Sequence, residues 1–80
     1  MKPEEVVPWL DKHLGLADER GYDENRPCLT FTARTSRGLP IRPKVVDQRP
    51  NGDKVYMMTV KQARKFRNFA VEVYGDNDGA

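Results

Sequence analysis

The 80-residue sequence has few of the residues that form disulfides, metal sites and catalytic sites. It contains a single cysteine, Cys28, and a single histidine, His13. One cysteine excludes an intramolecular disulfide, and no Cys/His spacing supplies a zinc site. No apolar run approaches the roughly 18 residues of a membrane-spanning helix, and the charged start of the chain has no signal-peptide apolar segment behind it. We therefore expect a cytoplasmic protein with no metal, no cofactor and no membrane partner.

The residue types of catalytic sites are equally sparse. His13 has no serine or cysteine at a recognisable triad spacing, and only Arg26 stands near enough in sequence to lower the pKa of Cys28. The acidic groups of residues 18–24 lack the fixed ligand spacing of a calcium loop. We predict no catalytic residue and no small-molecule substrate, and hence a non-enzymatic protein.

Length and composition bound the fold. Eighty residues make one domain, near the lower size at which a core can stabilise a fold, and the apolar fraction of 38% leaves little surplus to line a deep pocket. We expect a single compact domain over residues 1–75. Residues 76–80 are polar and terminal, and we expect them to form a disordered tail.

The pattern predicts a first helix over residues 3–14. Three apolar residues recur on one of its faces: Val6, Leu10 and Leu14. Pro8 would remove a hydrogen bond inside this helix, so a start at Pro8 is the alternative. Gly15 is expected to end it, because glycine readily takes the left-handed conformation of a helix C-terminus.

A second helix is predicted after Thr59, which forms a capping box with Gln62 three residues later. Its apolar arc comprises Ala63, Phe66, Phe69, Ala70, Val73 and Tyr74. The opposite side carries Lys61, Arg64, Lys65, Arg67 and Asn68. Gly75 is expected to end this helix.

Three strands are predicted between the helices, over residues 28–35, 40–48 and 53–58. Ser36-Arg37-Gly38 would turn the first strand into the second as a hairpin, and Asn51-Gly52 is a strong two-residue signal for another. Two prolines push the second strand toward a sheet edge or a bulge. The sequence thus predicts an α+β fold in the order α-β-β-β-α, with a three-stranded antiparallel sheet and two helices packed on one face.

Charge is unevenly distributed along the chain. Residues 26–67 hold eleven basic side chains against two acidic ones, whereas the segments on either side are net acidic. Such a field can steer an anionic partner to one part of the surface. The opposing interpretation is that a small protein covers its sheet and helix with Lys and Arg for solubility.

We expect the binding surface to combine the polar face of the first hairpin, its flanking turns and the last helix. The candidate residues are Arg34, Arg37, Arg42, Lys44, Arg49, Lys61, Arg64 and Lys65. The expected partner is an anionic macromolecule, with nucleic acid contacted through its phosphates as the first hypothesis. The alternative is a phage- or mobile-element-type modulator that inhibits a host complex by docking on an acidic protein surface. The sequence leaves the oligomeric state open.

The order of elements resembles the double-stranded RNA-binding domain. That family contacts RNA phosphates through a basic motif, commonly Ser-Lys-Lys-x-Ala-Lys, at the start of its last helix, and the corresponding stretch here runs from Thr59 to Arg64 with valine in place of one lysine. The resemblance implies that Lys61, Arg64 and Lys65 contact a duplex backbone. The family's Gly-Pro-x-His loop between the first two strands has no counterpart, and neither does its Gly-rich approach to the last helix.

Overall fold

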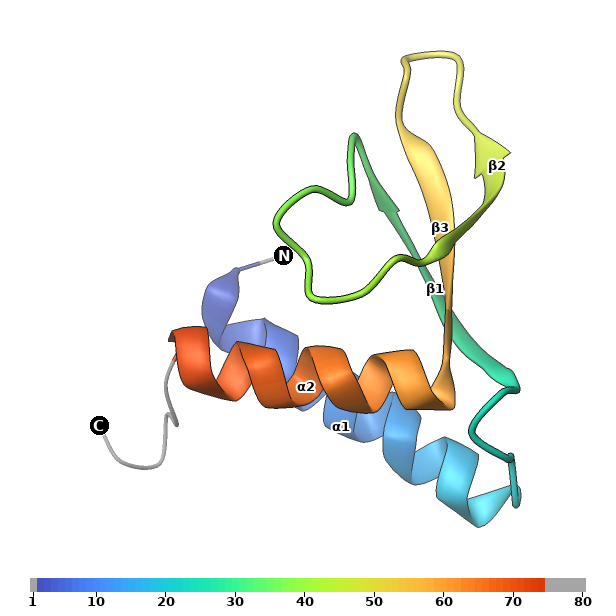
Figure 1. Cartoon of the computed structure of the whole chain (residues 1–80), viewed down its shortest axis with the longest axis vertical. Coiled ribbons are helices and arrows are strands. Elements are labelled where there is room, and N and C mark those ends of the chain that lie inside the picture. Colours follow the sequence, from blue (N-terminus) through green and yellow to red (C-terminus); the bar gives the residue numbers. More distant parts are fainter. Residues whose placement is uncertain (1, 75–80) are drawn as a thin grey trace.

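The computed structural model describes residues 2–74, and the predicted tail and Gly75 lie outside this range. The elements in chain order are α1 (Pro3–Glu19), β1 (Pro27–Ala33), β2 (Lys44–Gln48), β3 (Lys54–Thr59) and α2 (Val60–Tyr74). The predicted α-β-β-β-α fold with an antiparallel three-stranded sheet is confirmed. Figure 1 shows the two helices packed together beneath the sheet, and the β2–β3 hairpin reaching away from them. No helix within residues 2–74 is long and apolar enough to cross a membrane.

The first helix is longer than predicted, because it runs through both Pro8 and Gly15 to Glu19. Packing extends it: Ala17, one turn beyond the expected end, is 1% exposed. The termination signal lies instead at Gly21, which adopts a φ of 69°. The Gly21 N–H donates to the Asp18 carbonyl at 3.1 Å, and the Tyr22 N–H donates to the Ala17 carbonyl at 2.9 Å. These two bonds form a Schellman motif one turn and a half later than the sequence indicated.

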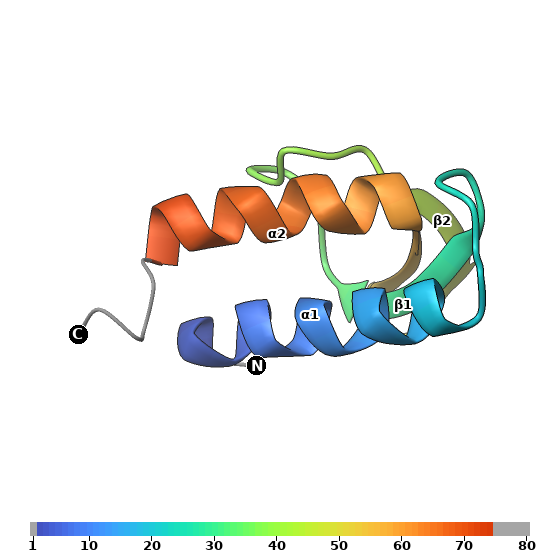
Figure 2. The same ribbon diagram turned by 90° about the horizontal axis from the view of Figure 1, so that it is seen from below.

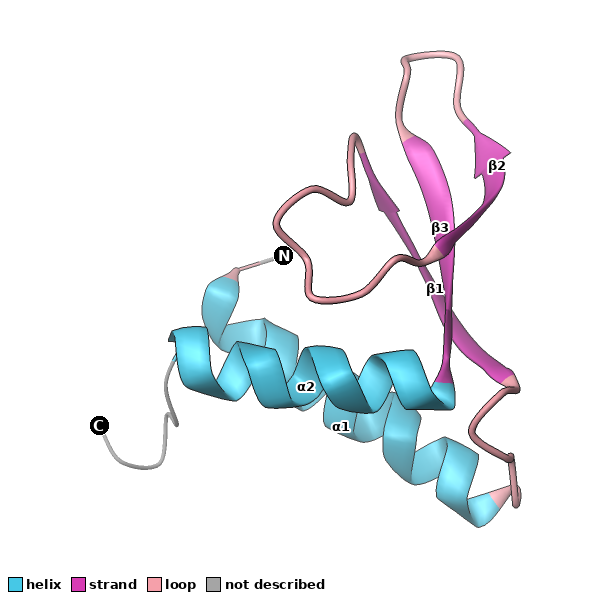
Figure 3. Ribbon diagram, viewed as in Figure 1, coloured by secondary structure: helices cyan, strands magenta, loops and turns pink. Residues whose placement is uncertain are grey.

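The sheet has the strand order β1-β3-β2, and this corrects the predicted pairing of its first two strands. β1 and β2 both run antiparallel to β3 and do not pair with each other, so no first hairpin exists. The segment from Arg34 to Pro43 is instead a crossover that passes beside α2 before β2 begins (Figure 3). Pro43 and Ile41 are buried in this crossover, and β2 begins directly after Pro43, at Lys44.

The predicted β2–β3 hairpin is present, but with a three-residue loop rather than a two-residue one. The Gly52 N–H donates to the Arg49 carbonyl at 3.1 Å and the Arg49 N–H donates to the Asp53 carbonyl at 2.7 Å. Pro50 suits the second position of a type I turn, and Gly52 follows with a φ of 94°. A two-residue type I′ turn would need positive φ at Asn51 as well, and no non-glycine residue in 2–74 adopts it.

The core lies between the helices and one face of β1 and β3. It is formed by Leu10, Leu29, Ile41, Met58, Ala63, Phe66 and Ala70. Side chains alternate along β1, since Leu29 is buried while Thr30 and Thr32 are exposed. Tyr56 of β3 is 3% exposed and stacks on Phe31 with ring centroids 5.3 Å apart. Their cross-strand pairing in the β1–β3 register makes this contact possible.

Helix α2 follows β3 with no intervening loop. The predicted capping box is confirmed, because the Thr59 N–H donates to Gln62 Oε1 at 3.0 Å and the Gln62 N–H donates to Thr59 Oγ1 at 3.2 Å. Phe66 and Ala70 on its apolar arc are buried. Val73 and Tyr74 were predicted to belong to the same arc, but they are exposed because they lie at the helix end remote from the sheet (Figure 2).

Alanine substitutions at Gly15, the predicted end of α1, and at Gly21, its observed end, should change the stability of the protein in opposite directions. A Cβ at Gly15 would meet nothing within 4 Å, and the residue is inside a helix, so Gly15→Ala should raise the free energy of unfolding by about 0.5–1 kcal/mol. Gly21→Ala places a Cβ in the left-handed region and should lower it by about 1 kcal/mol. Urea unfolding of both variants measures this. Destabilisation by Gly15→Ala would contradict the extended helix.

Candidate functional site

Three of the predicted binding residues meet at one place on the surface. Arg42 from the crossover and Lys61 and Lys65 from α2 line a shallow groove of about 310 Å³, together with Pro40, Ile41 and Gln62. Lys61 and Lys65 are four residues apart and therefore project from the same side of α2. No acidic side chain within residues 2–74 forms an ion pair with any of the three cations. We call Arg42, Lys61 and Lys65 the cation cluster.

Gln62 holds the crossover against the start of α2. Its Oε1 accepts from the Thr59 N–H at 3.0 Å, and its Nε2 donates to the Arg42 carbonyl oxygen at 3.1 Å. One amide side chain thus caps the helix and fixes the main chain of Arg42 beside it. This bond joins residues that are 20 positions apart in the sequence. This bond and the burial of Ile41 and Pro43 hold the basic crossover beside the basic helix.

The main-chain donors at the start of α2 are already occupied. The Val60 N–H donates to the Arg26 carbonyl and the Lys61 N–H donates to the Glu24 carbonyl, each at 3.0 Å. The Gln62 N–H donates to Thr59 Oγ1. A helix N-terminus often binds anions through free N–H groups. Here an anion in the groove would instead be contacted by the side chains of the cation cluster.

The predicted binding residues on the strands and their turns do not line the groove of the cation cluster. Lys44 begins β2, two residues after Arg42, and pairs with Met57. Arg49 lies at the hairpin turn, at the end of the sheet farthest from the helices (Figure 1). Arg34 follows β1 and its Nε lies 3.6 Å from an Asp53 carboxylate oxygen. The predicted polar face shared by Arg34, Arg42 and Lys44 is therefore wrong, because β1 and β2 are separated by β3.

Two basic residues of α2 are paired with acidic residues of α1. Arg64 Nη2 lies 3.0 Å from Asp18 Oδ1, and Arg67 Nε lies 3.0 Å from Asp11 Oδ1. The sequence showed no acidic compensation near these cations, because their partners are 46 and 56 residues away. The spacing carried a usable signal: Asp11 and Asp18 are seven residues apart, so they share one helix face. Charge segregation along the chain is therefore partly cancelled in space.

Cys28, the single cysteine, lies in β1 and is partly buried. Burial of Cys28 raises the pKa of its thiol, so its reactive thiolate form is disfavoured. No group of three or more His, Cys, Asp or Glu side chains within residues 2–74 is arranged to hold a metal ion. The chemistry available at the cation cluster is ionic contact with an anion, supported by the surrounding apolar and amide groups.

Comparison of the chain with protein-family models, with curated proteins and with solved structures gives no match.

The ion pairs between α1 and α2 are exposed, so they should contribute little to stability. Side-chain exposure is 52% for Arg64 and 65% for Asp18. A double-mutant cycle with Arg64→Gln and Asp18→Asn should give a coupling energy of about 0.2–1 kcal/mol at low salt, and less at about 1 M salt, because ions screen exposed charges. A coupling above about 2 kcal/mol would show that the pair is stronger than its exposure implies.

Proposed function

We propose that the protein is a non-enzymatic binding protein that engages the phosphate backbone of nucleic acid through the cation cluster. The observation that carries this proposal is the convergence of Arg42, Lys61 and Lys65 on one groove without a paired acid within residues 2–74. Lys44 is exposed at the start of β2 but does not line this groove. Arg64, which was a candidate at the outset, is assigned to the α1–α2 contact instead.

Phosphate is the anion that suits this arrangement. Arginine binds phosphate oxygens through its planar fork, while lysine acts as a mobile point charge. The groove is shallow and has no free main-chain donor at the start of α2. Gln62 accepts the Thr59 N–H and donates to the Arg42 carbonyl, so its amide is held within the fold. We therefore propose contacts to the backbone, with affinity that is independent of base sequence.

A salt titration of binding to random duplex and single-stranded DNA and RNA tests the proposal. Each phosphate neutralised on a duplex adds about 0.9 to the negative slope of log K against log salt. With three cations in the cluster, the expected slope for a duplex is about −2.7. Absence of binding to all four nucleic acids at about 50 mM salt would contradict the proposal. An acidic protein surface would then become the preferred partner.

Lys65→Gln and Arg64→Gln form a matched pair of variants, because neighbouring residues of one helix lose the same charge. Lys65 belongs to the cation cluster, whereas Arg64 is paired with Asp18. Lys65→Gln should weaken binding several-fold at about 100 mM salt and reduce the salt slope by about 0.9, whereas Arg64→Gln should leave the slope nearly unchanged. Fluorescence anisotropy with a labelled oligonucleotide measures both. Equal effects of the two variants would mean that only net charge matters.

A further inference from the structure

A second groove, on a different part of the molecule, lies along the free edge of β1. It has a volume of about 550 Å³ and is lined by four consecutive residues of that strand, Thr30 to Ala33. Successive strand side chains point to opposite faces of a sheet, so a groove that touches four in a row must follow the edge of the strand. β1 is an edge strand in the order β1-β3-β2.

The main-chain groups that face this edge can be assigned from the ladder. Val60 follows β3, and its N–H donates to the Arg26 carbonyl just before β1. Even-numbered residues of β3 therefore face β1, and their register partners Leu29, Phe31 and Ala33 face β3. The N–H and C=O groups of Thr30 and Thr32 consequently point outward. No hydrogen bond outside the sheet ladder engages either residue's main chain within residues 2–74.

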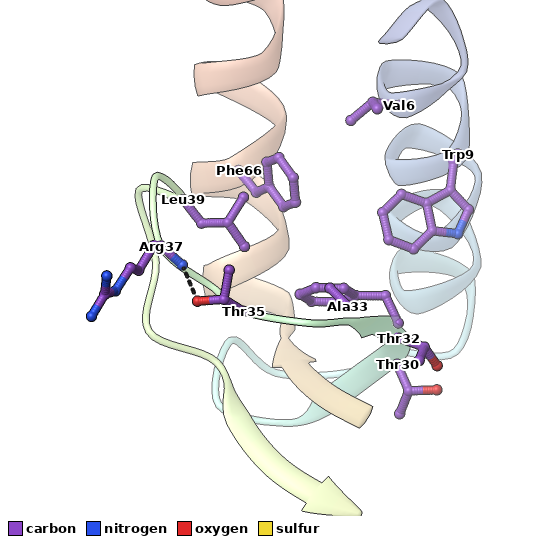
Figure 4. A pocket seen from close by; sticks show the side chains of 10 residues that line it. Val6, Trp9, Thr30, Thr32, Ala33, Thr35, Arg37, Leu39 and Phe66 are labelled. Atoms are coloured by element: carbon purple, nitrogen blue, oxygen red, sulfur yellow. Dashed lines mark hydrogen bonds between the residues drawn. The ribbon is translucent and has the colours of Figure 1, made fainter. Parts of the chain in front are cut away.

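The walls of the groove are apolar and come from three other segments. Val6 and Trp9 of α1 stand on one side, and Phe66 of α2 and Leu39 of the crossover stand on the other (Figure 4). Phe31 also lines the groove, and its ring centroid lies 6.4 Å from that of Trp9. An open apolar groove beside unpaired main-chain groups is the arrangement that accepts an added peptide strand, with one apolar side chain in the pocket.

The opposite edge of the sheet is less suited to this role. β2 contains a bulge between Val45 and Asp47, and Pro43 and Pro50 flank its two ends. Bulges and prolines interrupt the regular row of donors and acceptors that strand addition requires. β1 has its irregularity only between Pro27 and Leu29, before the groove begins. The geometry therefore selects the β1 edge.

We propose that this edge docks an extended segment of a partner protein, which adds as a fourth strand beside Thr30 and Thr32. A bulky apolar side chain of the segment enters the groove, and an acidic residue of the same segment pairs with Arg37. Among residues 2–74, Arg37 is the only charged residue that lines the groove, and its exposed side chain points away from the apolar side chains of the groove (Figure 4). No acidic side chain within residues 2–74 forms an ion pair with it. This positive charge complements a carboxylate where the bound segment leaves the groove.

A second copy of the chain is a poorer occupant. In a β1–β1 pair, the bulky apolar side chain available from the partner strand would be Phe31. That ring is already stacked on Tyr56 and packed against Trp9 within its own molecule. A second copy therefore has no free side chain of β1 to fill the groove, whereas a segment that folds on binding supplies one.

The test uses short peptides, acetylated and amidated, in which threonine and valine alternate around a central leucine or phenylalanine. Each peptide carries glutamate, glutamine or lysine two positions after the apolar residue. Trp9 is the only tryptophan in the chain and lines the groove, so its fluorescence reports binding directly. We expect the glutamate peptides to shift Trp9 emission and the amide resonances of Thr30 and Thr32. They should bind several-fold more tightly than the lysine peptides, and Arg37→Gln should abolish this preference.

Thr32→Pro removes an outward-facing N–H and leaves the bonds to β3 in place, whereas Thr32→Val keeps the N–H and changes only the side chain. Affinity should fall about fivefold to tenfold in the proline variant, the amount expected for one main-chain hydrogen bond, and should persist in the valine variant. If circular dichroism shows that Thr32→Pro is unfolded, a peptide N-methylated at the groups facing β1 makes the same test on the unaltered protein.

The proposal is overturned if no peptide at about millimolar concentration perturbs Trp9 or the β1 amides, or if N-methylation leaves binding intact. It is also overturned if light scattering shows a dimer whose dissociation exposes Trp9, because the occupant is then a second copy. Lys65 does not line the β1 groove, so the Lys65→Gln variant should bind the peptides as the unaltered protein does. Peptide binding therefore tests this proposal independently of nucleic-acid binding.

Discussion

The amide of Gln62 stands at the point where three segments of the chain meet. It caps α2 by accepting the Thr59 N–H, and it donates to the Arg42 carbonyl of the crossover. Because α2 follows β3 without a loop, this one side chain fixes the end of the sheet, the start of the helix and the path of the crossover together. Together with the buried Ile41 and Pro43, this bond holds the crossover where Arg42 lies beside Lys61 and Lys65.

Charge in this protein is organised by packing rather than by sequence position. α1 comes from the acidic end of the chain and lies along α2, where it pairs with Arg64 and Arg67. The cations on the other side of α2 keep no such partner within the described residues. The basic side chains of residues 26–67 therefore do not form one uniform group. Arg64 and Arg67 join the two helices through ion pairs, whereas the cation cluster has no paired acid within residues 2–74. The cation cluster is therefore the group available to an anion.

The sequence predicted the element order, the capping box of α2 and the alternation of β1, because these depend on local patterns of side chains. It did not predict that β3 lies between β1 and β2, since nothing local distinguishes a hairpin at Ser36–Gly38 from a crossover. Gly15 and Gly21 carry the same local signal, and the burial of Ala17 decided between them. For the site, the sequence predicted Arg42, Lys61 and Lys65 among eight candidate cations. It could not distinguish them from Arg64, because the pairing of Arg64 with Asp18 depends on how α1 packs against α2.

The central claim is that the cation cluster, and not the basic surface as a whole, contacts nucleic acid. Mapping of backbone amide chemical shifts during titration with a short random-sequence duplex tests it most directly. We expect the largest changes at Arg42, Lys61 and Lys65, with those of Arg49, Arg64 and Arg67 remaining small. Changes spread evenly over every exposed Lys and Arg, or centred on Arg64 and Arg67, would contradict it.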